Sequence, residues 1–179
     1  MLHVIATPIG NLGDVSERAR ETLRSAALVA CEDTRRTWQL LSHLGVPRPE
    51  MISYRQGNEE RLVDRIVEAV KAGKEVALCS DGGYPGISDP GYRLIRACAC
   101  ADVPYDVIPG PSAVNHVLMH TALSDRDRQV YRAYALNGED IAEVSKRFGI
   151  SRNSVSQIKT RVDRRIVAAG REMVENAGF

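Results

Sequence analysis

A loop rich in glycine and proline, SDGGYPGISDPG at residues 80–91, is the segment of this sequence best suited to hold a ligand. Glycine has no Cβ atom, so backbone N–H groups in such a loop can approach a small molecule closely, and the prolines fix its turns. Asp81 and Asp89 add carboxylate acceptors. We therefore interpret the loop as a binding element, with a purely structural turn as the less favoured alternative.

Two more loops of this kind follow strand-like runs. PIGNLGD, at residues 8–14, comes after the apolar run at 2–7, and PGPSA, at residues 109–113, comes after the run at 105–108. In an open parallel sheet the carboxyl ends of the strands meet at one edge, where such folds bind ligands. The three loops are therefore predicted to converge on one site. PIGNLGD lacks the G-x-G-x-x-G spacing that a nicotinamide dinucleotide site requires.

The segments between these loops alternate between short apolar runs and stretches of helical period. The strand-like runs are residues 2–7, 28–31, 75–79 and 105–108. The helical stretches are residues 16–26, 34–44, 59–72 and 90–101, with a further one from Ser112 to about Ala122. Strands that alternate with helices predict an α/β fold, a mostly parallel sheet with flanking helices and right-handed crossovers.

Only helical segments follow Leu123. They are expected at residues 125–136, 141–148 and 152–170. Gly149 relieves the turn between the last two, and the small residue Ala142 lets those two helices cross closely. This spacing is typical of a helix-turn-helix. We therefore predict an α/β domain at 1–122 and a small all-α helix-turn-helix domain at 123–179.

One face of the last predicted helix carries side chains suited to nucleic acid. They are Arg152, Asn153, Ser156, Gln157, Lys159, Thr160 and Arg164. Such side chains can reach base edges and phosphates in a major groove. The stretch from 123 to 167 resembles region 4 of sigma-70-type factors, and this resemblance implies DNA as a partner. Small helix-turn-helix units also serve in packing or dimerisation, so that alternative stays open.

Charge is unevenly distributed along the chain. Residues 1–122 contain 13 Lys and Arg against 15 Asp and Glu, and residues 123–179 contain 11 against 8. The net charges of −2 and +3 predict different partners for the two parts.

The four cysteines lack CxxC spacing, which favours free thiols over disulfides or a metal site. With neither a signal peptide nor a long apolar run in view, we expect a cytoplasmic location and no membrane partner.

Five motifs follow one another in the first 122 residues: VIATPIGNLGDVSERARETL, ACEDTRRTWQLLSHLGV, SYRQGNEE, VALCSDGGYPGISDPGYRLI and VIPGPSAV. In this order they resemble the small-subunit ribosomal RNA (cytidine-2'-O)-methyltransferase family, a branch of the tetrapyrrole methylases. The resemblance implies S-adenosylmethionine as cofactor and rRNA as the nucleic-acid partner. The cofactor-binding residues that it implies are Pro8, Gly10, Asn11, Asp81, Gly82, Gly83, Pro85, Gly86, Ile87, Pro109, Ser112 and Ala113.

Methyl transfer to a ribose hydroxyl needs a group that takes up the hydroxyl proton. A sulfonium is already an activated methyl donor, so the enzyme mainly has to align the attacking oxygen with the methyl group. Glu32, Asp33 and Asp81 are the acids that we expect as the general base or as its orienting partner. For Glu32 and Asp33, capping of the helix that begins near Thr34 is an equally good interpretation.

The sequence departs from the family pattern in three places. One is the run Arg55-Gln56-Gly57-Asn58, which stands where the family has a histidine-containing run. The family continues past PGPSA with a second α/β domain that completes the cofactor cleft, whereas helical segments follow here, and Tyr84 stands where the family's SDAGTPG motif has threonine. We therefore weigh two hypotheses. One is a methyltransferase acting on nucleic acid, with the helical module delivering RNA or DNA in place of the missing domain. In a variant of it the α/β part needs a partner that supplies the lost domain, and a homodimer could build a composite cleft. The other is a non-catalytic DNA-binding regulator that uses the α/β domain as a ligand sensor or dimerisation platform.

Overall fold

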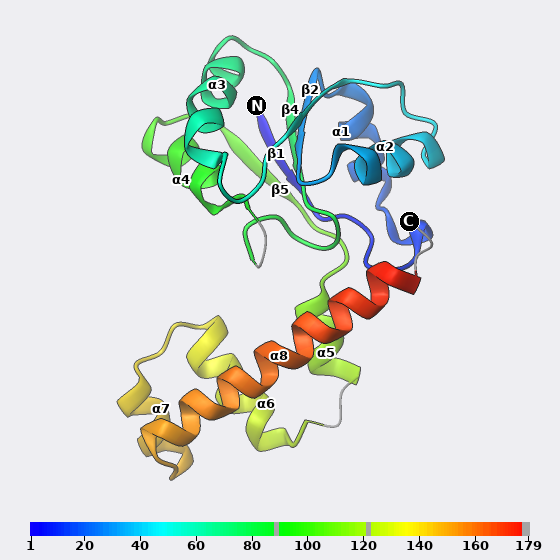
Figure 1. Ribbon diagram of the computed structural model, residues 1–179. Helices are drawn as coiled ribbons and strands as arrows, with labels where there is room; N and C mark the ends of the chain where they lie inside the picture. Colours follow the sequence, from blue (N-terminus) through cyan, green and yellow to red (C-terminus); the bar gives the residue numbers. More distant parts are fainter. Residues whose placement is uncertain (88–89, 121–122, 177–179) are drawn as a thin grey trace. The chain divides into compact units, whose positions relative to one another are not determined.

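The computed structural model describes residues 1–87, 90–120 and 123–176, which form two compact units. One is built mainly from Met1–Ser112 and the other from Ala113–Glu172 (Figure 1). The first unit has a hydrophobic core on each face of its sheet, and the second has a core between its helices. Within the described ranges, no helix is both long and apolar enough to cross a membrane.

Five short parallel strands form one sheet in the first unit. They are β1 (Leu2–Ile5), β2 (Leu28–Cys31), β3 (Glu50–Ser53), β4 (Val76–Cys79) and β5 (Tyr105–Ile108). Their order in the sheet is β3-β2-β4-β1-β5. Because all four pairings are parallel, the carboxyl ends of the strands lie at the same edge. The parallel sheet predicted from the alternating pattern is confirmed.

Strand β3 is an element that the sequence analysis did not predict. It lies at an edge of the sheet, its positions are exposed or half-buried, and its run EMIS contains only two strongly apolar residues. A strand with so little buried surface leaves a weak apolar signal. The first strand is also shorter than expected, because Thr7 leaves the parallel ladder and pairs antiparallel with Gly83.

Helices cover both faces of the sheet (Figure 1). They are α1 (Glu17–Ser25), α2 (Thr34–His43), α3 (Glu59–Lys71) and α4 (Tyr92–Cys100), with a short 3-10 turn, η1 (Leu12–Asp14). Ile66 of α3 and Leu94 of α4 belong to the core on one face. Leu23 of α1 and Leu41 of α2 belong to the core on the other. The flanking helices predicted from the sequence are therefore confirmed.

Neighbouring strand residues face opposite cores, as the two-residue period of a strand requires. Val4 packs with α3 and α4, and Ile5 packs with α1 and α2; Leu78 and Cys79 of β4 divide in the same way. The central strands β2 and β4 are buried at every position. This two-sided burial explains why their runs, LVAC and VALC, are continuously apolar.

The second unit is helical. Its elements are α5 (Ala113–His120), α6 (Asp125–Tyr131), the π-helical turn η2 (Arg132–Leu136), α7 (Ile141–Phe148) and α8 (Arg152–Asn176). Val117, Val144, Val155 and Val162, each at most 1% exposed, are the centre of the core. Since Val117 belongs to α5, this helix contributes to the core of the second unit.

Capping side chains mark where these helices begin. Ser124, Asp140 and Ser151 each accept a hydrogen bond from a backbone N–H in the first turn that follows. Helix α7 ends at Gly149, whose φ of 60° lies in the left-handed region that glycine adopts readily. Helices α7 and α8 are therefore joined by a short turn, with Val144 on one and Val155 on the other sharing a core.

Candidate functional site

The loops after β1, β4 and β5 meet at the carboxyl edge of the sheet. Thr7 and Gly83 exchange two backbone hydrogen bonds, of 2.9 and 3.0 Å, which join the first two loops. The Thr7 hydroxyl donates a further bond to the carbonyl of Ser80 at 3.0 Å. The Gly110 N–H donates to the hydroxyl of Tyr84 at 3.1 Å, so the loop after β5 joins the same group.

Asp81 lies between the loop after β4 and the start of α2. Its Oδ1 accepts a hydrogen bond from the backbone N–H of Asp33 at 3.1 Å, and its Oδ2 lies 3.9 Å from the guanidinium of Arg36. Burial raises the pKa of the Asp81 carboxyl, while the Asp33 N–H and the Arg36 charge act in the opposite direction. A carboxylate in this setting is more basic than one in water.

Asp33 is the N-cap of α2. Its Oδ1 accepts the backbone N–H of Arg35 at 2.8 Å, and its Oδ2 is ion-paired with the Arg35 guanidinium at 3.2 Å. The hydrogen bonds from the side chain and backbone of Arg35 hold the pKa of the Asp33 carboxyl below its usual value. The geometry therefore favours the capping interpretation of Asp33 over a role as proton acceptor.

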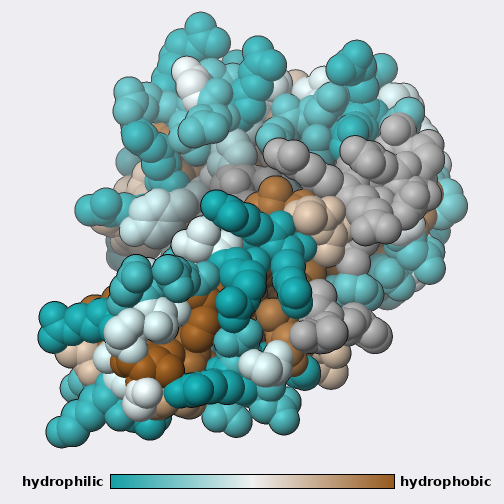
Figure 2. Space-filling view, turned by 60° about the horizontal axis from the view of Figure 1, so that its bottom comes forward, coloured by the Kyte–Doolittle hydropathy of each residue, from teal (hydrophilic) through white to brown (hydrophobic). Residues whose placement is uncertain are grey.

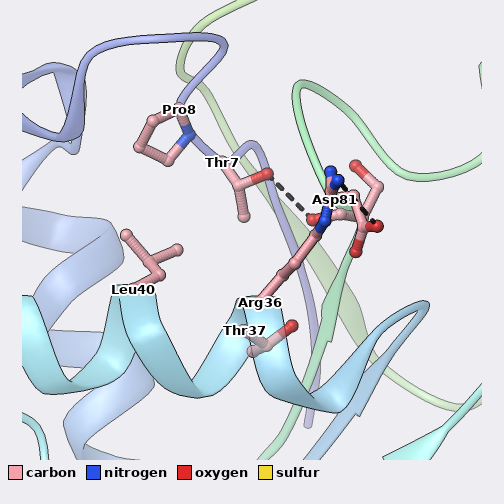
Figure 3. A pocket seen from close by; sticks show the side chains of 7 residues that line it. Thr7, Pro8, Arg36, Thr37, Leu40 and Asp81 are labelled. Atoms are coloured by element: carbon pink, nitrogen blue, oxygen red, sulfur yellow. Dashed lines mark hydrogen bonds and ion pairs between the residues drawn. The ribbon is translucent and has the colours of Figure 1, made fainter. Parts of the chain in front are cut away.

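A hollow opens beside Asp81 (Figure 3). Its empty volume is about 310 Å³, including space continuous with solvent, and its lining residues are Thr7, Pro8, Arg36, Thr37, Leu40, Ser80 and Asp81. Figure 3 shows the Arg36 side chain extending from α2 toward Asp81, with Leu40 and Pro8 on the other side of the opening. The hollow thus has an apolar wall and a charged wall.

Five of these lining residues, Thr7, Ser80, Arg36, Thr37 and Leu40, were not predicted from the sequence as cofactor contacts, although Ser80 opens the loop at 80–91 and Thr7 directly precedes the loop at 8–14. Arg36, Thr37 and Leu40 come from the first two turns of α2, which begins directly after the acidic pair at the end of β2. Their one available signal is the helical spacing of positions 36, 37 and 40 just past a strand end. That signal alone does not separate a pocket wall from the ordinary buried face of a helix.

The polar groups of the hollow differ in how far they are already engaged. The Thr7 hydroxyl donates to the backbone carbonyl of Ser80 at 3.0 Å. The Ser80 hydroxyl donates to the backbone carbonyl of Gly83 at 3.2 Å. Arg36 and Asp81 instead face each other at 3.9 Å, and their side chains are 38% and 24% exposed. A loose pair of opposite charges beside apolar side chains suits a ligand that carries both charges and an apolar part.

The residues predicted to contact a cofactor are distributed over the same three loops. Pro8 and Asp81 line the hollow, and Gly83 forms the bridge to Thr7. The others are Gly10 and Asn11 after β1, Gly82, Pro85, Gly86 and Ile87 after β4, and Pro109 and Ser112 after β5. Ala113 begins α5 in the second unit. Asp89, named above as an acceptor, lies outside the described residues.

Several of these residues have evident local roles. The Asn11 side chain caps η1 by accepting the Gly13 N–H at 2.9 Å. Gly86 has a φ of 85°, and a Cβ atom there would lie 3.1 Å from the backbone nitrogen of Tyr92. Ile87 is 60% exposed. The glycine therefore permits a close approach of the loop to the start of α4.

Glu32 follows β2 at the same edge, where its backbone carbonyl accepts a hydrogen bond from the Ser53 hydroxyl at 3.2 Å.

Three cysteines of the first unit are buried. Cys31, the last residue of β2, is fully buried, and this burial raises the pKa of its thiol to about 11. All four cysteines are free, and burial also raises the thiol pKa of Cys79 and Cys98. Buried thiols of this kind are poor nucleophiles at neutral pH.

In the second unit, most of the side chains predicted to contact nucleic acid lie at the surface of α8. Arg152, Asn153, Gln157, Thr160 and Arg164 are exposed, and Ser156 and Lys159 are half-buried. Figure 2 shows hydrophilic side chains interspersed with apolar ones on the visible face of this unit. The exposed groups leave α8 available for a polar partner.

Lys159 is ion-paired within the unit. Its ammonium lies 2.6 Å from Oδ2 of Asp163, whose Oδ1 accepts the Tyr131 hydroxyl at 2.9 Å. Arg161 forms a similar ion pair with Asp127. These contacts connect α8 to α6, and they neutralise part of the positive charge of the Lys and Arg residues on α8.

An open parallel sheet with helices on both faces is the architecture of the doubly wound α/β proteins, which bind ligands where their strands end. The chain belongs to the Tetrapyrrole (Corrin/Porphyrin) Methylases, because the model of this family matches residues 1–168. The match extends past the last of the five motifs into α8. The methyl donor of these methylases is S-adenosylmethionine, the cofactor expected from the sequence.

Curated relatives carry the name ribosomal RNA small subunit methyltransferase I. The one from Xylella fastidiosa is 48% identical over 113 residues, which are 63% of this chain and 41% of that protein. The one from Synechocystis is 42% identical over 134 residues, which are 75% of this chain and 47% of that protein. This chain therefore spans about half the length of the curated relatives that it matches.

A solved structure has the same fold. The uroporphyrin-III-C-methyltransferase from Thermus thermophilus superposes with a TM-score of 0.54 at 18% identity, covering 69% of this chain and 54% of that one. A second structure of that Thermus thermophilus enzyme, in its native form, gives a TM-score of 0.51 at 19% identity. At such low identity the likeness establishes the fold of the α/β part.

Proposed function

We propose that the chain binds S-adenosylmethionine at the hollow beside Asp81 and takes part in methylation of a ribose hydroxyl in small-subunit rRNA. The observation that carries the proposal is the pair formed by Arg36 and Asp81, which face each other at 3.9 Å at the carboxyl edge of the sheet. The names of the curated relatives support the rRNA substrate. The matched family supports the methyl donor.

The lining residues fit the chemistry of this cofactor. S-adenosylmethionine has a carboxylate, an ammonium, a cationic sulfonium and an adenosine moiety. The Arg36 guanidinium suits the carboxylate, the Asp81 carboxylate suits a cationic group, and Pro8 with Leu40 offers an apolar surface. When bound, the cofactor supplies an activated methyl group. The residues of this chain hold it and orient it toward the attacking oxygen.

Among the three predicted acids, we favour Asp81 as the group that takes up the hydroxyl proton. Its pKa is raised by burial, which brings its basicity closer to the working pH, whereas Arg35 lowers the pKa of Asp33. Asp33 then acts as a positioning residue, since its backbone N–H holds one oxygen of Asp81. Glu32 stays a candidate through its place at the end of β2.

Calorimetric titration of S-adenosylmethionine into the purified chain tests the site. We expect saturable binding that Arg36→Gln weakens by about ten- to a hundredfold, because a hydrogen bond to a charged group contributes roughly 1.5–3 kcal/mol. Arg24→Gln, at an exposed position near the end of α1, is the matched control and should bind as the parent chain does. Binding that is absent in the parent, or equal in the Arg36 variant, would contradict the proposed site.

A second function, binding of nucleic acid by the helical unit, is favoured by a separate observation. Five polar or basic residues predicted to contact nucleic acid are exposed on α8, directly after the short turn at Gly149. We propose that this helix binds the phosphate backbone of DNA or rRNA, in line with its resemblance to sigma-70 region 4. Assembly of a homodimer that completes the cofactor cleft belongs to the methyltransferase proposal, and analytical ultracentrifugation of the chain would test it.

A further inference from the structure

The side chain of Tyr84 connects two of the three loops at the carboxyl edge. Its hydroxyl accepts a hydrogen bond from the Gly110 backbone N–H at 3.1 Å. Tyr84 belongs to the loop after β4, and Gly110 belongs to the loop after β5. Strand β1 lies between β4 and β5 in the sheet, so this contact spans the position of an intervening strand.

Gly110 also lies in close contact with Ala6, the residue that follows β1. A Cβ atom at Gly110 would lie 3.0 Å from the Cβ of Ala6 and 3.1 Å from its carbonyl oxygen. These distances are too short for any other residue to be accommodated without a shift of Ala6. The loop after β5 therefore rests directly on the end of β1 and contacts Tyr84 on its other side.

A closed ring of contacts results. The loop after β1 is bonded to the loop after β4 through Thr7 and Gly83, the loop after β4 is bonded to the loop after β5 through Tyr84, and that loop rests on Ala6. Two of these links use backbone atoms or the absence of a side chain. The third depends on the phenol group of Tyr84, so a change to this one side chain can open the ring.

We propose that Tyr84 is a positioning residue that holds the loop after β5 in place before a ligand arrives. This inference rests on the proposed function, because the ligand in question is S-adenosylmethionine. Pro109 and Ser112 of this loop are among the residues predicted to contact the cofactor. A loop that is already fixed loses less conformational freedom when it binds, so the affinity is higher. The length of the phenol group matters, since a threonine hydroxyl attached directly to Cβ would end several bonds short of Gly110.

The experiment compares Tyr84→Phe and Tyr84→Thr with the parent chain, and uses Tyr105→Phe as control. Tyr105 is the first residue of β5, so it lies at the amino ends of the strands, away from the loops of the site, and it is 43% exposed. Tyr84→Phe keeps the aromatic side chain and removes only its hydroxyl, so we expect the fold to be retained. Amide hydrogen exchange of Gly110, measured by NMR, reports the hydrogen bond, and calorimetric titration reports the affinity for S-adenosylmethionine.

We expect exchange at Gly110 to be about tenfold faster in Tyr84→Phe, and affinity to fall roughly three- to tenfold, as for loss of one ordinary hydrogen bond. Tyr84→Thr should match or exceed both effects, and the control should match the parent. Unchanged exchange at Gly110 would overturn the hydrogen-bonded connection. Faster exchange with unchanged affinity would overturn the positioning role. Absence of binding in the parent chain would overturn the proposed function itself, while the exchange rates would still decide whether Tyr84 holds Gly110.

Discussion

Oδ1 of Asp81 accepts the backbone N–H of Asp33 at 3.1 Å, and this hydrogen bond joins the ends of two adjacent strands, β4 and β2. The bond uses the backbone of the residue whose own carboxylate caps α2. Asp33 therefore caps the helix that presents Arg36, and Asp81 lies 3.9 Å from Arg36 on the charged wall of the hollow. The two acids have different roles although both follow a strand.

Replacement of Asp33 separates capping from catalysis. Asp33→Ala should lower the free energy of unfolding by about 1 kcal/mol, the usual cost of losing an N-cap, which corresponds to roughly 2–4 °C in melting temperature. Asp33→Asn keeps the acceptor for the Arg35 N–H and should restore most of this loss. Thermal melts followed by circular dichroism measure both. A large loss of methyl transfer in a fully stable Asp33→Asn variant would instead support a role in proton transfer.

The charge of Asp33 has a predictable pH dependence. Its pKa in the folded chain is lowered, first by the hydrogen bond from the Arg35 side chain, so the charged form stabilises the fold above the unfolded pKa, which is about 3.9. This contribution is lost as the pH falls through the lowered folded value. The small difference in melting temperature that remains between the parent chain and Asp33→Asn should therefore be present at pH 6, shrink as the pH falls below the unfolded pKa and vanish below the lowered folded pKa.

Replacement of Asp81 by asparagine should have opposite effects on stability and on binding. Burial raises the pKa of the Asp81 carboxyl, so its charged form is disfavoured in the fold and costs stability once the pH exceeds the unfolded pKa of about 3.9. Asp81→Asn keeps an acceptor for the Asp33 N–H and should melt at the same or a higher temperature at pH 7. Its affinity for S-adenosylmethionine should fall by about tenfold, as for a lost charged contact. An unchanged dissociation constant would place the cofactor elsewhere.

The turn between α7 and α8 depends on the backbone of Gly149. Its φ of 60° is left-handed, and no atom outside its neighbours lies within 4 Å of a Cβ built there. Gly149→Ala should therefore destabilise the helical unit through backbone strain alone, by roughly 1 kcal/mol. Gly149→Asn should cost less, since asparagine visits this region more readily. Equal melting temperatures for all three chains would show that the turn relaxes.

Salt dependence tests whether α8 binds nucleic acid through phosphates. For the parent chain on duplex DNA, the logarithm of the binding constant should fall linearly with the logarithm of the salt concentration, and Arg152→Gln should reduce the slope by about 0.9 for one lost phosphate contact. Fluorescence anisotropy at several salt concentrations gives the slopes, with Arg24→Gln as control. Identical slopes for the parent and Arg152→Gln would remove Arg152 from the interface.

Much of the architecture could be predicted from local patterns. The central strands are visible as continuous apolar runs because both of their faces are buried, and β3 was missed because it lies half-exposed at an edge. Helix starts at Asp33, Ser124 and Asp140 could be predicted because capping is a contact between residues two or three positions apart. Such features depend only on neighbours along the chain.

The sequence by itself determined the α/β alternation, the loops rich in glycine and proline after three strands, and the family to which the chain belongs. The tertiary structure decided which side chains meet. Strand β2 lies beside β4, so Asp33 reaches Asp81, 48 positions away, and α2 places Arg36 in the hollow. Tyr84 reaches Gly110, 26 positions away, across the end of β1. The order of strands in a sheet follows from packing of the whole core, and no local spacing along the chain specifies it.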